Sequence, residues 1–223
     1  MDMTQIKKWC ATALLLIAIV VSHYCSFSFF VGSHSLHISP FLALVPLIGS
    51  LWGVRGSLGF FGFWGLYKYA LRGAAVTGGI PTLLATLSWT SNQENKKVLS
   101  FLLHVLFPLT CIAIFCCHPV GRYAWPYAMY WFIPVVAYLG QKNKHVIVYA
   151  LQSTFVAHAA GSIMWLFLRP LSPVSWLSLI PVVAAERLVL ACMMVIAYKI
   201  GISLMGYVRN CTLKKGLIRV SHD

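Results

Sequence analysis

Acidic residues are almost absent from this chain. Its 223 residues contain four carboxylates against 17 lysines and arginines, which gives a formal net charge of +13. Charged residues make up 9% of the chain and hydrophobic residues 60%, whereas a soluble domain carries about 25% charged residues. There are too few polar residues to cover a soluble domain of this length, so the apolar residues are expected to face lipid. The composition therefore predicts an integral membrane protein.

Motifs of common catalytic sites are also missing. The chain contains no GxSxG or HExxH motif, and four carboxylates are too few to favour a paired-carboxylate mechanism. The seven cysteines form no CxxC pair. The cations lie mostly in short loops and tails between apolar runs, a pattern typical of retention on the cytoplasmic side rather than of nucleic-acid binding. We expect no enzymatic activity, no cofactor and no nucleic-acid partner.

Apolar runs recur along the chain at a length that can cross a bilayer, which is about 20 residues. Spans are expected at 9–31, 98–117, 123–139, 146–168 and 176–205. Residues 38–90 are less regular, because Arg55-Gly56 separates two apolar stretches and the run 80–89 is too short to span. The sequence predicts one all-α bundle over residues 1–206, with a broken or re-entrant region around 72–90. A basic cytoplasmic tail is expected at 207–223.

The cations predict the orientation of these spans. Ten lysines and arginines fall on one side of the predicted spans, in both terminal segments, in the polar loop at 91–97 and in the loop at 140–145, while only Arg122 and Arg169 fall in the opposite loops. By the positive-inside rule both termini are cytoplasmic, and an even number of spans is then required. Six spans result if residues 38–90 make one net crossing, and eight result if they make three. We favour six, in a bacterial inner membrane.

Glu186 and Arg187 are the most informative candidate site residues. They lie ten and eleven residues beyond Trp176, which is ~15 Å along a helix and close to the bilayer midplane. Ionisable groups at that depth are costly and usually face the interior of a bundle. Neighbouring residues on a helix point about 100° apart, so a simple pair between them is not expected. Arg187 then needs backbone carbonyls, Glu186 by a bent route, water, or a ligand carboxylate or phosphate.

The predicted helix 146–168 carries polar residues that could line a binding site. Thr154 and His158 follow one another at helical spacing, and Gln152 lies nearby. Such a face is typical of a cavity wall. It is equally typical of helix–helix contact, because Ala157 and Gly161 form a small-xxx-small pair that permits close approach.

Two further segments supply candidate binding residues. Thr77 lies in a glycine-rich segment at apparent membrane depth, where irregular backbone offers free N–H and C=O groups, although a plain surface loop is the alternative. Trp131 belongs to an aromatic stripe at helical spacing, formed by Tyr127, Tyr130, Trp131 and Pro134. An aromatic wall can stack a planar ligand, but residues of this kind also form interfacial belts.

The chain resembles, in outline, the substrate-binding subunits of energy-coupling-factor vitamin transporters. The shared features are the length, the expected six spans, the cytoplasmic termini and the proline-containing run 38–46 that leads to Gly49 and Gly53. No diagnostic substrate motif is found, and Ala18 and Ser22 are the nearest candidates for the small-residue signature expected on the first helix. The resemblance implies a vitamin-like substrate and separate ATPase and coupling subunits as partners.

The sequence thus leads to three hypotheses for function. The first is transport of a small organic solute, anionic or carboxylate-bearing because the cations at membrane depth exceed the acids, with the bilayer and the solute as partners. The second is a non-transporting scaffold or assembly protein with a dry interior. The third is a metal transporter that uses histidine and cysteine side chains.

Overall fold

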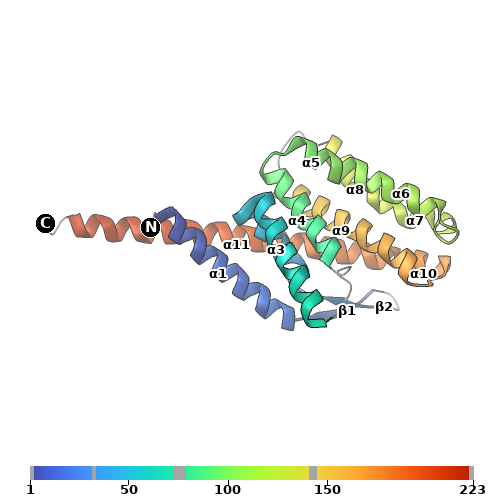
Figure 1. The fold of residues 1–223 in the computed structure, drawn as a ribbon, viewed down its shortest axis with the longest axis horizontal. Coiled ribbons are helices and arrows are strands. Elements are labelled where there is room, and N and C mark those ends of the chain that lie inside the picture. Colours follow the sequence, from blue (N-terminus) through green and yellow to red (C-terminus); the bar gives the residue numbers. More distant parts are fainter. Residues whose placement is uncertain (1–2, 32–33, 73–78, 141–144, 221–223) are drawn as a thin grey trace.

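The structure is a bundle of helices with one small β-hairpin (Figure 1). It is a computed structural model that describes residues 3–31, 34–72, 79–140 and 145–220. The principal elements are α1 (Met3–Tyr24), β1 (Phe27–Val31), β2 (His34–Ile38), α2 (Phe41–Leu44), α3 (Ile48–Arg72), α4 (Ile80–Gln93), α5 (Lys97–Phe101), α6 (Phe107–Cys117), α7 (Trp125–Ala128), α8 (Phe132–Leu139), α9 (Val146–Leu168), α10 (Pro173–Ser178) and α11 (Ile180–Val220). Short 3₁₀ or π segments join some of them: η1 (Val45–Leu47), η3 (Leu102–Leu106), η4 (Gly121–Tyr123) and η5 (Met129–Trp131).

Helix α9 lies at the centre of the bundle. It contacts α4, α6, α8 and α11, and buried residues are found around its whole circumference. The segment contains no proline and a single glycine, Gly161, so nothing in it opposes a continuous helix. The helix ends before Arg169, which is extended because the next residue is Pro170. Because α9 touches most of the bundle, its side chains position the groups of the candidate site.

Four helices are long and apolar enough to cross a membrane. By length and composition they are Phe41–Trp64, which contains a kink at Gly53, Lys97–Cys117, Val146–Leu168 and Ile180–Ser203, and a shorter apolar helix covers Thr12–Ser22. The predicted spans at 98–117 and 146–168 are confirmed as helices with nearly the same bounds. The chain is a multi-pass helical membrane protein, with four such helices in the part of the chain that the structure describes.

Two predicted spans differ from the structure. The span expected at 9–31 ends at Tyr24, and β1 then pairs with β2 as an antiparallel hairpin. The β-branched and aromatic residues of these segments favour strands, so the all-α prediction needs this small exception. The span expected at 123–139 is divided among η4, α7, η5 and α8. Pro126 stands near the start of α7 and Pro134 near the start of α8, at positions where a helix accepts proline.

The last helix is longer than the sequence predicts. We expected a span at 176–205 followed by a tail, whereas α11 begins at Ile180 and remains helical to Val220. In Figure 1 its C-terminal part projects beyond the bundle at the same end of the molecule at which α1 begins.

Helix α3 folds back on itself at Gly53. A continuous helix would place Gly49 and Ser57 about 12 Å apart, yet a β-carbon at Gly49 would lie 3.4 Å from Oγ of Ser57. Gly53 has φ 67° and ψ −169°, a conformation that a residue with a side chain rarely adopts. At Gly56 a β-carbon would overlap the side chain of Trp52. The chain therefore turns sharply at Gly53, between Gly49 and Gly56. This turn is close to the interruption predicted at Arg55-Gly56.

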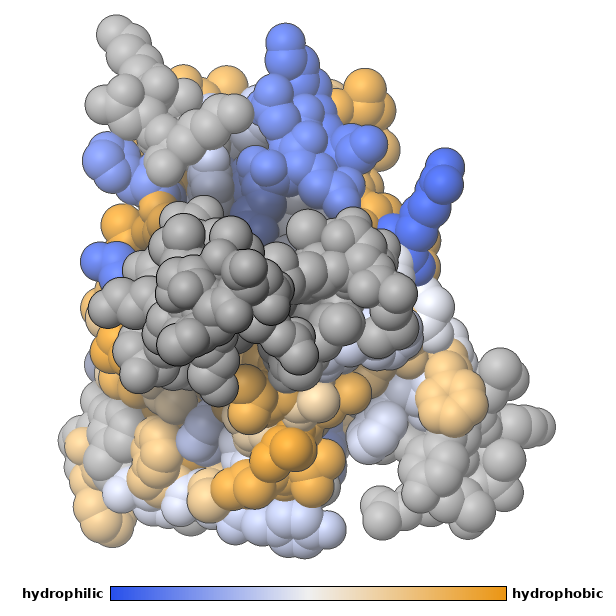
Figure 2. Space-filling view, turned by 90° about the vertical axis from the view of Figure 1, so that its left-hand side faces the viewer, coloured by the Kyte–Doolittle hydropathy of each residue, from blue (hydrophilic) through white to orange (hydrophobic). Residues whose placement is uncertain are grey.

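The bend lies against the end of α4. A β-carbon at Gly49 would overlap the Thr90 side chain, and one at Gly53 would overlap the Glu94 carboxylate. The first part of α3 and the end of α4 therefore run in the same direction and finish at the same level. Figure 2 looks at the end of the molecule where both chain ends lie. Hydrophilic residues gather in its upper part, where Figure 1 places the junction between α4 and α5.

Candidate functional site

Glu186 and Arg187 form an ion pair on α11. Nη2 of Arg187 lies 2.7 Å from Oε2 of Glu186, and the two side chains are 12% and 20% exposed. As the sequence predicts, the two neighbours do not pair by a simple alignment of their side chains. Adjacent Cβ atoms diverge on a helix, but both side chains have enough rotatable bonds to bend toward each other. Of the partners that the sequence left open for Arg187, the bent route to Glu186 is realised.

The same guanidinium also reaches α9. Nη1 of Arg187 donates to the carbonyl oxygen of Thr154 at 3.4 Å, a long hydrogen bond. Nε of Arg187 is buried and has no hydrogen-bond partner. Arginine carries five N–H donors, so the contacts made here leave part of its donor capacity unused. The charge is held between two helices rather than at the edge of the bundle.

His158 lies one turn beyond Thr154 on the same face of α9. Its Nε2 atom is buried without a hydrogen-bond partner. Aromatic rings surround the imidazole, with centroids 5.5 Å away for Tyr127 and 6.4 Å away for both Trp131 and Phe155. A buried polar atom without a partner is costly, so this nitrogen is a second unused polar group in the site.

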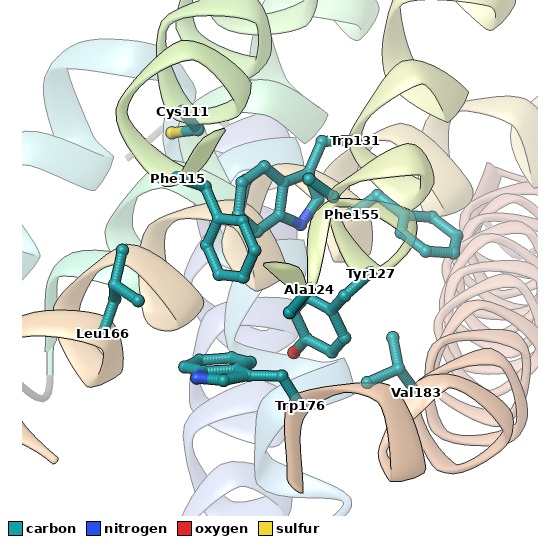
Figure 3. Packing of buried hydrophobic residues seen from close by; sticks show 11 residues of the cluster. Cys111, Phe115, Ala124, Tyr127, Trp131, Phe155, Leu166, Trp176 and Val183 are labelled. Carbon is teal, nitrogen blue, oxygen red and sulfur yellow. The ribbon is translucent and has the colours of Figure 1, made fainter. Parts of the chain in front are cut away.

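Trp131 belongs to a buried aromatic cluster between α6, α7 and the start of α11 (Figure 3). The Phe115 ring makes edge contacts at 5.3 Å with both Trp131 and Trp176. The hydroxyl of Tyr127 is 3.1 Å from Oγ of Ser162. Nε1 of Trp131, however, is buried without a partner. Tyr127 and Trp131 thus lie inside the bundle rather than in an exposed belt.

Gln152 is separated from this group by its own contacts. Its Oε1 accepts a hydrogen bond from Nδ2 of Asn92 at 2.9 Å, and its Nε2 donates to the carbonyl of Pro134 at 3.4 Å. These partners lie on α4 and on the α8 segment, whereas Arg187 lies on α11. The structure therefore brings together Glu186, Arg187, Thr154, His158 and Trp131, and it places Gln152 in a different seam. Thr77 lies outside the described residues.

That second seam is a run of buried polar pairs between α4, the α5–η3 segment and α9. Oγ of Ser88 lies 2.7 Å from Nε2 of His104, and Ser100 donates to Ser91 at 3.1 Å. Ser153 of α9 donates to the carbonyl of Ala85 at 2.7 Å. We expected residues 91–97 to form a polar loop, whereas α4 continues through Gln93. The density of Ser, Thr and Asn within a helical stretch was the signal that could have revealed this seam.

The site carries no histidine–cysteine constellation. Across residues 3–31, 34–72, 79–140 and 145–220, no three His, Cys, Asp or Glu side chains gather as metal ligands. One hollow lies between α1 and α3 and another between α3 and α4, and neither is bordered by Glu186 or Arg187. The site is therefore a group of charged and polar side chains packed between helices.

Comparison with known proteins gives no relative. No family model, curated protein or solved structure matches this chain. The resemblance to vitamin-transporter subunits therefore rests on membrane architecture alone, and the chain is identified as a multi-pass helical membrane protein.

Proposed function

We propose that this chain transports a small organic anion, either alone or as the substrate-binding subunit of a larger transporter that has its own ATPase. The observation that supports this proposal most is the arginine held inside the bundle with unused donor capacity. Nε of Arg187, Nε2 of His158 and Nε1 of Trp131 are all buried without partners. A carboxylate can accept several such hydrogen bonds at once and would also receive the charge of the guanidinium.

The chemistry of the group favours an anion over a cation or a neutral solute. Arginine and tryptophan side chains only donate hydrogen bonds, and a neutral histidine can donate from one of its two ring nitrogens. Glu186 is the nearest acceptor and is already bound to Arg187 at 2.7 Å. A ligand carboxylate that enters the group takes over part of this ion pair, and the aromatic rings around His158 offer surfaces for a planar substituent.

Stabilisation by ligands tests the proposal even while the substrate is unidentified. Purified protein in detergent is heated in the presence of mono- and dicarboxylates, including the ring-bearing carboxylates biotin and nicotinate. A carboxylate at 100 times its dissociation constant should raise the unfolding midpoint by about 5 °C. Arg187→Gln should remove this rise, whereas Lys97→Gln, at an exposed position, should preserve it. A rise that persists in Arg187→Gln would exclude this arginine from the binding site.

A non-transporting assembly protein is a second candidate, and the packing around Arg187 favours it. The guanidinium lies between α9 and α11, and Arg187 lines neither the hollow between α1 and α3 nor the hollow between α3 and α4. In that case the ion pair joins helices and no carboxylate stabilises the wild-type protein. Uptake by proteoliposomes of any carboxylate that does stabilise it then decides between binding and transport.

We propose that both termini lie on the cytoplasmic side of a bacterial inner membrane. The charge distribution predicts this arrangement, and the start of α1 and the end of α11 at one end of the molecule support it. The bend at Gly53 beside Glu94 supports a cytoplasmic position for Arg55, at the level of the Lys96-Lys97 loop. The three helical segments of this region are α3 before Gly53, α3 after Gly53, and α4. If each of them passes partly or fully through the membrane, the total is eight passes, whereas the sequence favours six.

Sided labelling of Arg55 tests this topology. In a cysteine-free background, Arg55→Cys should react with a membrane-impermeant maleimide in inside-out vesicles and be protected in right-side-out vesicles. Arg55 is exposed in the structure, and in the proposed topology it lies at the membrane surface and not within a straight span. Lys96→Cys is the control and should label from the same side. Protection of Arg55→Cys from both sides, or labelling from the opposite side, would contradict the topology.

A further inference from the structure

A polar hollow of about 350 Å³ opens where α3 folds back. The turn of α3 before the bend and the end of α4 form its wall: Gly49, Ser50, Leu51, Trp52, Gly53, Gln93 and Glu94. A second hollow, of about 270 Å³, lies between α1 and α3 and is lined mainly by apolar side chains, among them Leu16 and Phe60. The polar hollow therefore has a lining unlike that of its neighbour and is separate from the Arg187 group.

The first part of α3 ends at the polar hollow. The conformation of Gly53 ends the first part of the helix, and the last four carbonyl groups of a helix have no regular partner within it. Four residues of that turn, 49–52, line the hollow. The C-terminal end of a helix also carries the negative end of its dipole. Ser57 donates to the carbonyl of Gly53 at 2.8 Å, which fixes the geometry of the bend.

Glu94 supplies a carboxylate to the same hollow. A β-carbon at Gly53 would overlap its Oε1 atom, so the carboxylate lies directly against the bend. Arg55, Lys96 and Lys97 are close in the chain and exposed. None of them forms an ion pair with Glu94, since the one ion pair among the described residues joins Glu186 and Arg187. Glu94 is itself exposed, and its carboxylate lies against the bend without an ion-pair partner among the described residues.

We propose that this hollow binds one alkali cation of the sodium type. Its lining residues are the helix end at 49–53 together with Gln93 and Glu94. Backbone carbonyls, a carboxylate, an amide and the Ser50 hydroxyl carry oxygen atoms of the kind that suit a hard cation. Ser50 is held in place because its Oγ accepts a hydrogen bond from Nε1 of Trp89 at 2.7 Å. The lining contains one carboxylate, which matches a single positive charge, whereas sites for divalent ions draw on more ligand charge. Carbonyls of broken membrane helices coordinate sodium in this manner.

The cation site stands apart from the proposed anion site. It is formed by α3 and α4, whereas the Arg187 group is formed by α9, α11 and the aromatic cluster. If the chain transports an anion, a bound alkali cation offers a way to couple that transport to an ion gradient, because no ATP-binding motif occurs in the sequence. The cation binds whether or not the anion does, so the two proposals fail separately.

Thermal unfolding in different salts tests the cation site. Purified protein is heated in 100 mM NaCl, in KCl, and in N-methylglucamine chloride of equal ionic strength. Sodium should raise the unfolding midpoint by about 5 °C over N-methylglucamine if its dissociation constant is near 1 mM. Radiolabelled sodium should bind to the wild-type protein at about one ion per chain. Equal midpoints in all salts, together with no bound sodium, would refute the proposal.

Variants separate this site from general salt effects. Glu94→Gln keeps the size of the side chain and should abolish both the sodium-dependent rise and the sodium binding. Lys96→Gln removes a neighbouring charge and should retain them, as should Arg187→Gln at the other site. If Glu94→Gln does not fold, Gln93→Ala, which leaves the carboxylate in place, should weaken sodium binding at least threefold. Sodium binding that is undiminished in Glu94→Gln would overturn the proposal. If Gln93→Ala has to replace that variant, undiminished sodium binding in Gln93→Ala would do the same. A rise in the unfolding midpoint with methylammonium but not with sodium would also overturn it.

Discussion

Replacing Arg187 with glutamine should lower the free energy of unfolding by about 3 kcal/mol, because it leaves Glu186 without its partner inside the bundle. The pair is short, at 2.7 Å, and its two side chains are 12% and 20% exposed. Glutamine also loses the hydrogen bond to the Thr154 carbonyl. The resistance of the purified protein to denaturation in mixed detergent micelles measures the change.

The double replacement of Glu186 and Arg187 by glutamine separates structure from function. It removes both charges, so no unpaired carboxylate remains, and neutral replacement of a buried pair often costs little stability. We expect the double variant to recover most of the stability lost by Arg187→Gln. Stabilisation by carboxylates should nevertheless remain absent, because the cation that attracts them is gone.

Two outcomes would contradict this account of the pair. Equal stability of Arg187→Gln and the wild type would mean that the ion pair contributes nothing to the fold. Carboxylate stabilisation retained in the double variant would mean that binding occurs elsewhere, and Arg187 would then serve helix packing alone.

The central helix was predictable because local and long-range signals agree there. Residues 146–168 are apolar, lack proline and are followed by Arg169-Pro170, so both the span and its end follow from the sequence. Thr154 and His158 share a face at helical spacing, and the structure keeps them together. Gln152 stands only two residues before Thr154, which turns it about 200° away. It therefore meets Asn92 of α4 instead of Arg187.

The bend in α3 and the cation hollow depend on contacts that no local pattern contains. The sequence shows an interruption at Arg55-Gly56, but a glycine also fits a straight helix in a membrane. What decides the matter is that α4 brings Thr90 and Glu94 against Gly49 and Gly53. The hairpin after Tyr24 is a different case, because β1 and β2 are neighbours in the chain and pair with each other. Their aromatic and β-branched residues favour strands over the end of an apolar helix.

Trp131→Ala should destabilise the protein by about 3 kcal/mol, the lower end of the range for large aromatic truncations in a core. The indole is fully buried, and its ring lies 5.3 Å from that of Phe115 and 6.2 Å from that of Tyr127. Lipid is as apolar as a protein core, so the loss comes from packing contacts and the cavity rather than from transfer out of water. A smaller change would show that α6 and α9 close over the gap.

Trp131→Phe distinguishes a packing role from a role in binding. Phenylalanine keeps a ring in the cluster but lacks the indole N–H, which has no partner in the protein. Its cost in stability should therefore be about 1 kcal/mol. If the N–H donates to a bound carboxylate, the same variant should weaken carboxylate binding about tenfold, the loss expected for one hydrogen bond to a charged acceptor. Unchanged carboxylate binding in Trp131→Phe would assign Trp131 to the packed core and reduce the anion site to the Arg187 and His158 side chains.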